Sequence, residues 1–167
     1  MSVKARACAV DGTDHKGGRV MREANILVVD EDETIRLMLS CALVISGHKV
    51  VATASAEELL LLLAENGGME ETIDLLLADM ELPGLSGLEL VDELHRRGFC
   101  MPAIIMSWTN SREVVSGAVG RHCVGYFPKP FQLSSLMGAI EGCLAGVAGT
   151  REREGADSTE KIFSGHL

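Results

Sequence analysis

Five short apolar segments alternate with five amphipathic helical segments along the middle of this chain. The apolar segments are the runs at 26–29, 48–53, 73–78, 102–107 and 124–127. The helical segments follow them one by one, at 34–46, 55–66, 87–97, 111–119 and 134–147. Parallel strands need a crossover connection, usually a helix, and such crossovers are right-handed. The alternation therefore predicts an α/β fold, in which a doubly wound parallel sheet is covered by helices on both faces.

Composition is consistent with one folded domain that has an aliphatic core. Hydrophobic residues make up 47% of the 167 residues but aromatic residues only 4%, so Val, Ile and Leu must fill the core. We expect a disordered N-terminal extension at 1–21, because this segment mixes glycine, alanine and charges without a period. The folded domain is expected at 22–148, and the segment 149–167 is expected to form a polar C-terminal tail.

The charge distribution argues against binding to nucleic acids, and the short apolar runs argue against a membrane span. Residues 22–149 carry 18 acidic and 8 basic side chains, whereas duplex binding requires a basic surface that neutralises phosphates. The leucine run at 59–63 is far too short to span a membrane, and residues 1–20 lack the apolar segment of a signal peptide. The 5 cysteines form no C-x-x-C pair, which is typical of reduced thiols. We therefore expect a cytoplasmic protein.

Charged and polar side chains stand at the ends of four predicted strands. Asp30 and Glu31 follow the first strand, Asp79 follows the third, Ser107 ends the fourth, and Lys129 follows the fifth. In doubly wound folds the ligand site lies at this carboxyl edge of the sheet. The first strand lacks the glycine-rich loop that binds a dinucleotide. Clustered carboxylates can instead hold Mg²⁺, and with the metal and the lysine present a phosphoryl group can approach Asp79.

Four sequence blocks at these strand ends resemble those of bacterial response-regulator receiver domains. The blocks are ILVVDEDETIR (26–36), DLLLADMELPGLSGLEL (74–90), PAIIMSW (102–108) and GYFPKPF (125–131). They occur in the family's order, and the resemblance covers about residues 24–147. It implies a flavodoxin-like (βα)5 sandwich with a five-stranded parallel sheet in the order 2-1-3-4-5. It also implies a phosphoacceptor with at most self-phosphorylation and self-dephosphorylation activity, rather than an enzyme.

The resemblance assigns a role to each residue of the expected metal site. Asp79 matches the phosphoacceptor, and Asp30 and Glu31 match the acidic pair that binds Mg²⁺. Asp79 itself and the backbone carbonyl of Glu81 complete the implied set of metal ligands.

Three further positions match the family's switch and phosphate-binding residues. Ser107 matches the switch hydroxyl, Tyr126 matches the rotating switch aromatic residue, and Lys129 matches the phosphate partner. The resemblance also implies a cis bond between Lys129 and Pro130, as X-Pro bonds in tight turns permit.

The sequence departs from the family's pattern at one of these positions, Glu31, and at a neighbouring one, Trp108. Glu31 stands where aspartate is more usual, so the charge is kept but the metal can shift. Trp108 stands where the family generally carries a small residue. We expect its indole ring to narrow access to the pocket, which would slow self-phosphorylation from small donors and hydrolysis of the phospho form. Glu81 and Thr109 flank the same pocket and are expected to tune these rates.

The resemblance also implies the partners of the chain. A histidine kinase or phosphotransfer protein would supply the phosphoryl group to a monomer or a phosphorylation-dependent dimer. A downstream protein would bind the face built from the fourth helix, fifth strand and fifth helix. Candidate contact residues on that face are Val114, Val115, Ala118, Tyr126, Gln132 and Ser135. Because the segment after Val147 is short and polar, we expect a stand-alone receiver domain that resembles chemotaxis receivers.

An enzyme is one alternative to this function. The run 30–34 fits DxDxT, the nucleophile motif of haloacid-dehalogenase-type phosphatases. Asp30 would then attack the phosphoryl group, and Asp32, otherwise expected to be a helix N-cap, would act as general acid. Against this alternative, no acidic pair follows Lys129 to complete that family's metal site, and Asp79 would have no role.

A binding module is the other alternative. Such a pseudo-receiver would bind its partner without taking a phosphoryl group, and the unusual residues Trp108 and Glu31 favour it. The presence of Asp79, Ser107 and Lys129 together argues against it.

Overall fold

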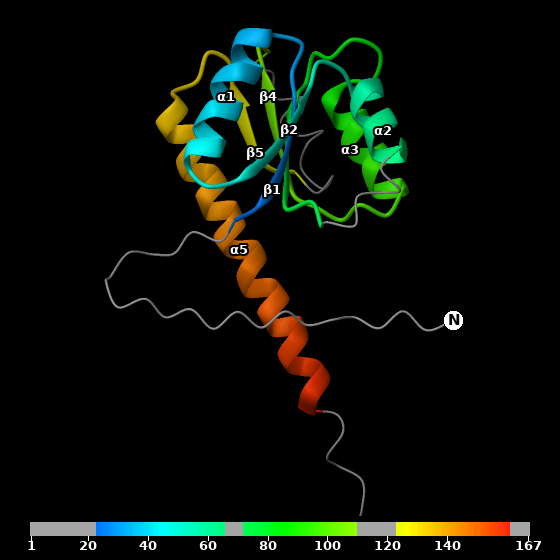
Figure 1. Ribbon diagram of the computed structural model, residues 1–167, viewed down its shortest axis with the longest axis vertical. Coiled ribbons are helices and arrows are strands. Elements are labelled where there is room, and N and C mark those ends of the chain that lie inside the picture. The colour runs from blue at the N-terminus through cyan, green and yellow to red at the C-terminus, as the bar shows by residue number, and fades with distance from the viewer. Residues whose placement is uncertain (1–22, 66–71, 110–122, 161–167) are drawn as a thin grey trace, which may run out of the picture.

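A parallel sheet of five strands forms the centre of the structure (Figure 1). The computed structural model describes residues 23–65, 72–109 and 123–160. The strands are β1 (Asn25–Val29), β2 (Lys49–Thr53), β3 (Leu75–Asp79), β4 (Ala103–Ser107) and β5 (Cys123–Pro128). They pair in the order β2-β1-β3-β4-β5, and every neighbouring pair is parallel. The predicted fold class and strand order are therefore confirmed.

Helices cover both faces of the sheet. Those described are α1 (Glu33–Ile45), α2 (Ala56–Glu65), α3 (Gly87–Arg96) and α5 (Leu133–Glu160). Figure 1 shows α1 and α5 on one side of the sheet and α2 and α3 on the other. The extension predicted at 1–21 and the helix predicted at 111–119 lie outside the described residues.

The central strands are buried on both faces, which explains why they read as unbroken apolar runs. In β3, Leu76 and Ala78 belong to the core cluster under α2 and α3, whereas Leu75 and Leu77 belong to the cluster under α1 and α5. This alternation follows from the two-residue repeat of a strand, which points successive side chains to opposite faces. Two aliphatic cores therefore hold β3 in place, and Asp79 is its last residue.

Side-chain caps start the two helices that follow the acidic strand ends. Asp32 caps α1, with its carboxylate accepting hydrogen bonds from the N–H groups of Thr34 and Ile35 at 2.8 and 3.3 Å. Ser86 and Glu89 form a reciprocal capping box at the start of α3. The first cap turns the chain into a helix directly after β1, and the second does so after the segment that follows β3. The predicted N-cap role of Asp32 is confirmed.

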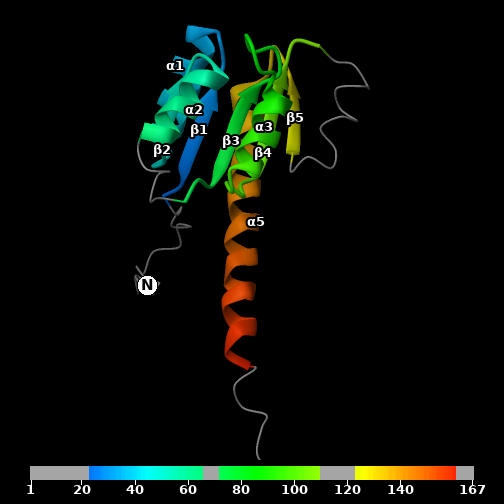
Figure 2. The same cartoon turned by 90° about the vertical axis from the view of Figure 1, so that its right-hand side faces the viewer.

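The last helix is longer than the sequence predicted. We expected it to end at Val147, but α5 continues to Glu160. Figure 2 shows its C-terminal part extending beyond the sheet. The expectation was wrong because polar composition was interpreted as an irregular tail. Alanine, arginine and glutamate are good helix formers, and residues 148–160 contain no proline that would stop the helix.

Within the described ranges, no helix is both long enough and apolar enough to cross a membrane.

Because β3 is buried on both faces, shortening one of its side chains should strongly lower the free energy of unfolding. Leu77 is fully buried, so Leu77→Ala should lower the free energy of unfolding by about 2–5 kcal/mol, through lost burial and the cavity that remains. The matched control is Leu61→Ala on α2, where the side chain is 60% exposed and the expected change is about 0.5 kcal/mol or less. Urea unfolding measures both values. Similar losses for the two variants would contradict this account of the core.

Candidate functional site

Four of the predicted site residues meet at the carboxyl edge of the sheet. Asp79 and Ser107 are the last residues of β3 and β4, Asp30 directly follows β1, and Lys129 directly follows β5. All four are buried although they are polar or charged. Parallel strands that pair in register end at one edge, so residues far apart in the sequence become neighbours there.

The ammonium group of Lys129 lies between two carboxylates. Its Nζ atom is 2.7 Å from Oδ2 of Asp30 and 2.7 Å from Oδ2 of Asp79. Burial lowers the pKa of Lys129, but the hydrogen bonds and charges of the two aspartates outweigh burial and hold it above its ordinary value. The lysine is therefore a fixed positive charge at the centre of the site.

Asp79 is the carboxylate whose protonation is most affected by this environment. Burial raises its pKa to about 6, because the loss of hydration disfavours the anion more than the hydrogen bonds from Lys129 and Glu81 favour it. Its Oδ1 atom accepts a hydrogen bond from the N–H of Glu81 at 3.1 Å. The negative charge of Asp30 contributes to this rise in the pKa. Additional positive charge near Asp79, such as a bound cation, would therefore lower its pKa and favour the ionised carboxylate.

The acidic side chains at this edge fit a hard cation such as Mg²⁺. Within the described part of the chain, the buried Oδ2 atom of Asp30 has no hydrogen-bond partner beyond its ion pair with Lys129. No group of three or more His, Cys, Asp or Glu side chains among the described residues could hold a metal by itself. Mg²⁺ does not require one, because one or two carboxylates, a carbonyl and several waters suffice. Among the described residues, Asp30 and Asp79 are the buried carboxylates at this edge.

The side chain of Glu31 is exposed, unlike that of Asp30. Its backbone carbonyl accepts a hydrogen bond from Nη1 of Arg36 at 2.9 Å, and the carbonyl of Asp30 accepts one from the same atom at 2.7 Å. Arg36 therefore fixes the backbone of the acidic pair. The sequence analysis did not identify it. The available signal was a cation near the start of a helix, where the helix dipole disfavours positive charge.

The side chain of Glu81 bridges from the end of β3 to the end of β4. Ser107 donates its hydroxyl hydrogen to Oε1 of Glu81 at 2.5 Å, and the N–H of Trp108 donates to Oε2 at 3.2 Å. Burial raises the pKa of Glu81, but these and other hydrogen bonds outweigh it and hold the pKa below its ordinary value. From the sequence, Glu81 was expected to offer its backbone carbonyl to the metal and to tune the reaction rates, but its side-chain contact with Ser107 was not predicted.

Trp108 and Tyr126 lie at the rim of the site. The Trp108 side chain is 58% exposed, and the centre of its ring is 5.6 Å from Nζ of Lys129, which is a cation–π contact. The hydroxyl of Tyr126 donates a hydrogen bond to the carbonyl of Thr109. The predicted cis bond between Lys129 and Pro130 is present.

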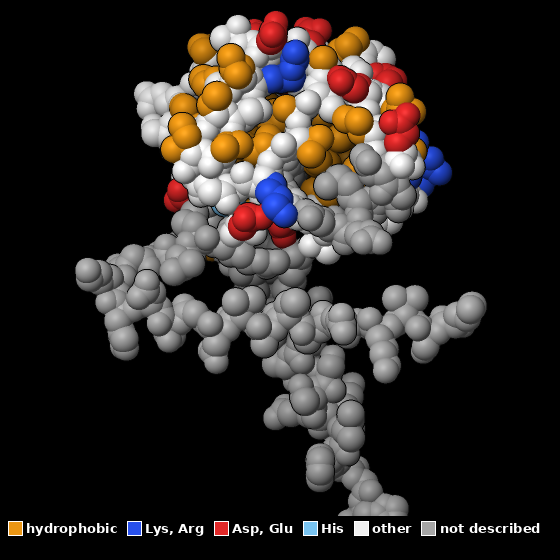
Figure 3. All heavy atoms as spheres, viewed as in Figure 1, with side chains coloured by type: hydrophobic (Ala, Val, Ile, Leu, Met, Phe, Trp, Pro, Cys, Tyr) orange, Lys and Arg blue, Asp and Glu red, His pale blue; other side chains and the backbone are white. Residues whose placement is uncertain are grey.

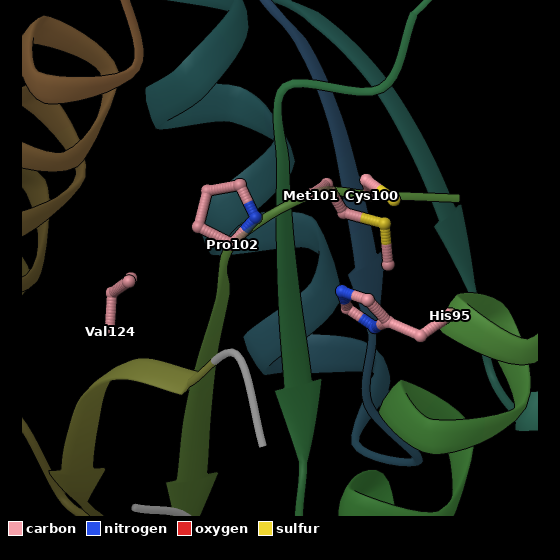
Figure 4. Close-up of a pocket in the computed structure, with 5 residues that line it drawn as sticks. All are labelled: His95, Cys100, Met101, Pro102 and Val124. Atoms are coloured by element: carbon pink, nitrogen blue, oxygen red, sulfur yellow. The ribbon is translucent and has the colours of Figure 1, made fainter. Parts of the chain in front are cut away.

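A cavity of about 270 Å³ lies at the opposite edge of the sheet (Figure 4). Its described lining residues are His95, Cys100, Met101, Pro102 and Val124. They come from the end of α3, the segment just before β4 and the start of β5, and none is acidic. This cavity is therefore separate from the carboxylate cluster.

The raised pKa of Asp79 predicts a pH dependence of stability. The folded state holds the Asp79 proton more tightly than the unfolded state, so this contribution is complete below the ordinary pKa of 3.8 and is lost as the pH rises through about 6. Without divalent ions, the wild-type free energy of unfolding should therefore fall relative to that of Asp79→Asn across this range. Urea unfolding at several pH values measures the difference, with the exposed Glu65→Gln as control. Parallel profiles for wild type and Asp79→Asn would contradict the assignment.

Known proteins similar to this chain include response regulators. A family model described as Response regulator receiver domain matches residues 26–141. The transcriptional regulator NtrC of Azospirillum brasilense is 34% identical over 124 residues, which are 74% of this chain and 25% of that protein. The response regulator FleR of Pseudomonas aeruginosa is 28% identical over 137 residues, or 82% of this chain and 28% of FleR. The chain thus spans about a quarter of the length of these curated relatives.

Solved structures show the same fold. A CheY-like receiver domain protein from Methanospirillum hungatei superposes with a TM-score of 0.68 and 26% identity, over 77% of this chain and 99% of that one. NtrX from Brucella abortus superposes with a TM-score of 0.69 and 27% identity, over 80% of this chain and 30% of NtrX. Since the family match includes β1 to β5 and the whole carboxylate edge, this chain belongs to the response regulator receiver domain family.

Proposed function

We propose that Asp79 receives a phosphoryl group from a histidine kinase or phosphotransfer protein, and that the phosphorylated chain signals by contact with another protein in the cytoplasm. The observation that carries this proposal is the placement of Lys129 Nζ at 2.7 Å from both Asp79 and Asp30. A phosphoryl dianion can approach a carboxylate only where positive charge offsets the repulsion.

The transfer uses Asp79 as nucleophile. A carboxylate oxygen of Asp79 forms a bond to phosphorus while the phosphorus–nitrogen bond of a phosphohistidine breaks, and the released imidazole takes up a proton. The ammonium group of Lys129, already paired with Asp79, can then bind an oxygen of the new phosphoryl group. Mg²⁺ held by Asp30, Asp79 and the carbonyl of Glu81 would supply further charge neutralisation when bound, and Glu31 would add negative charge beside it.

Signalling would begin at Ser107. Phosphorylation adds about −1.5 to −2 units of charge and three acceptor oxygens, to which the Ser107 hydroxyl can donate. Tyr126 would then turn inward, and the proposed output face would change shape. On that face, Gln132 and Ser135 are exposed near the start of α5. The other proposed contact residues, Val114, Val115 and Ala118, lie outside the described residues.

An apolar surface on α1 is consistent with a protein as phosphodonor. Leu37, Val44 and Ile45 are 64%, 59% and 85% exposed, and Figure 3 shows hydrophobic side chains over this helix. Contiguous exposed apolar side chains commonly mark contact sites for other proteins. The helix begins three residues after Asp30, so a protein bound there would lie beside the acidic edge.

The stand-alone arrangement expected from the sequence stays a prediction. NtrC and FleR extend well beyond the matched region, because the chain covers 25% and 28% of their lengths. The proposal concerns the receiver domain itself and is the same whether or not other domains accompany it.

The phosphatase alternative requires Asp32 to act as a general acid. Its carboxylate accepts hydrogen bonds from two N–H groups at the start of α1, and these hydrogen bonds hold its pKa below the ordinary value. A carboxylic acid in this environment releases its proton too readily to serve as a general acid near neutral pH. The helix cap therefore argues against this alternative. A pseudo-receiver stays as the second candidate, since Trp108 partly covers Lys129.

Intact mass spectrometry after incubation with Mg²⁺ and a promiscuous histidine kinase tests the proposal. Wild type should gain one phosphoryl group, and Asp79→Asn should gain none. A label that survives Asp79→Asn and disappears in Asp30→Asn would support the phosphatase instead. No label on a correctly folded wild type with any donor would support the pseudo-receiver.

The exposed indole of Trp108 predicts slow turnover of the phospho form. Trp108→Ala should shorten its lifetime roughly two- to fivefold, since a contact of about 0.5–1 kcal/mol over Lys129 would be lost and water would enter more easily. Trp108→Phe keeps an aromatic ring and should lie closer to wild type. Loss of the phosphoryl mass over time gives the three rates. A wild-type lifetime no longer than that of Trp108→Ala would show that the indole has no such role.

A further inference from the structure

One carboxylate holds the end of β4 through two consecutive residues. Glu81 lies two residues after Asp79, and its side chain reaches Ser107, the last residue of β4, and Trp108 directly after it. Oε1 accepts the Ser107 hydroxyl hydrogen at 2.5 Å, and Oε2 accepts the Trp108 N–H at 3.2 Å. Hydrogen bonds to an ionised acceptor are about twice as strong as those between neutral groups. The position of the switch hydroxyl therefore depends on Glu81.

The Ser107 hydroxyl has only one hydrogen to donate. Its oxygen is 2.5 Å from Glu81 but 3.2 Å from the carbonyl of Thr109, so the hydrogen belongs mainly to the bond with Glu81. Ser107 is fully buried, which leaves bulk water no access to it. In the proposed function this same hydrogen must be donated to a phosphoryl oxygen on Asp79. Glu81 and the phosphoryl group thus compete for one donor.

We propose that Glu81 is a latch: its carboxylate holds Ser107 in the position that this residue has while Asp79 is unphosphorylated. The inference rests on the proposed function of Asp79. The N–H of Glu81 donates to Oδ1 of Asp79, so a phosphoryl group there would lie close to the Glu81 segment. The two negative charges would repel each other. Phosphorylation therefore both requires the Ser107 hydroxyl and weakens the group that retains it.

Release of the latch would reach Tyr126 through a short chain of hydrogen bonds. The N–H of Thr109 donates to Oγ of Ser107 at 2.9 Å, and the carbonyl of Thr109 accepts the hydroxyl hydrogen of Tyr126. Movement of Ser107 away from Glu81 would therefore displace Thr109, and with it the acceptor that holds Tyr126. Glu81 acts here as a positioning residue, because it works through Ser107 rather than on the phosphoryl group.

Titration with beryllofluoride and Mg²⁺, a stable mimic of a phosphorylated carboxylate, tests the latch. Binding can be followed by the fluorescence of Trp108, the chain's only tryptophan, and independently by ¹⁹F NMR of the bound fluoride. Glu81→Ala should bind roughly tenfold more tightly than wild type, because Ser107 no longer has to leave a strong acceptor. Glu81→Gln keeps the size and one acceptor oxygen but lacks the charge, so its affinity should fall between the two.

A double-mutant cycle with Ser107→Ala separates the latch from simple charge repulsion. Without the Ser107 hydroxyl there is nothing to retain and only the charge repulsion remains, so the gain in affinity from Glu81→Ala should then fall to about threefold or less. A tenfold gain that persists in the Ser107→Ala background would overturn the latch, as would equal affinities for wild type and Glu81→Ala. Wild type that binds no better than Asp79→Asn would overturn the proposed function and, with it, the latch.

Discussion

Two buried aspartates share one buried lysine, and the rest of the site is arranged around this contact. Removing a carboxylate from water costs several kcal/mol, so two carboxylates buried side by side at the sheet edge need a nearby cation. Lys129 supplies that cation at 2.7 Å from each. One positive charge does not balance two negative charges, and burial keeps the pKa of Asp79 at about 6. A bound cation would therefore stabilise the site further, and so would a reaction that converts the Asp79 carboxylate into a covalent product.

In the proposed mechanism, the rim of the site would convert a local charge change into a change of position. Glu81, Ser107, Thr109 and Tyr126 form a continuous series of hydrogen bonds from the end of β3 to β5. The strands on which these residues depend are packed between two aliphatic cores and cannot adjust easily. If Asp79 is phosphorylated, the side chains at the rim and the segments that connect strands and helices would therefore move, whereas the strands would stay in place. The stable sheet and the movable rim have separate roles in one signalling domain.

Sequence patterns predicted the parts of the structure that depend on local chemistry and on strand order. Apolar runs, Asp32 as a helix cap and the carboxyl-edge residues could be assigned because parallel strands end together. The contact of the Glu81 side chain with Ser107 could not be predicted, because it joins residues 26 positions apart and depends on side-chain orientation. Arg36 was missed because it acts on backbone carbonyls, and a cation near the start of a helix does not by itself show which groups it contacts. The length of α5 was underestimated because polar residues form solvated helices as readily as tails.

The most direct measurement of the central claim is to locate the phosphoryl group on the chain. Borohydride reduces an aspartyl phosphate to homoserine, so the phosphorylated protein can be reduced, digested and sequenced by tandem mass spectrometry. The account predicts homoserine at position 79 and aspartate at position 30. Homoserine at position 30, or a phosphoryl group that resists borohydride because it is carried on a hydroxyl or an imidazole, would contradict it.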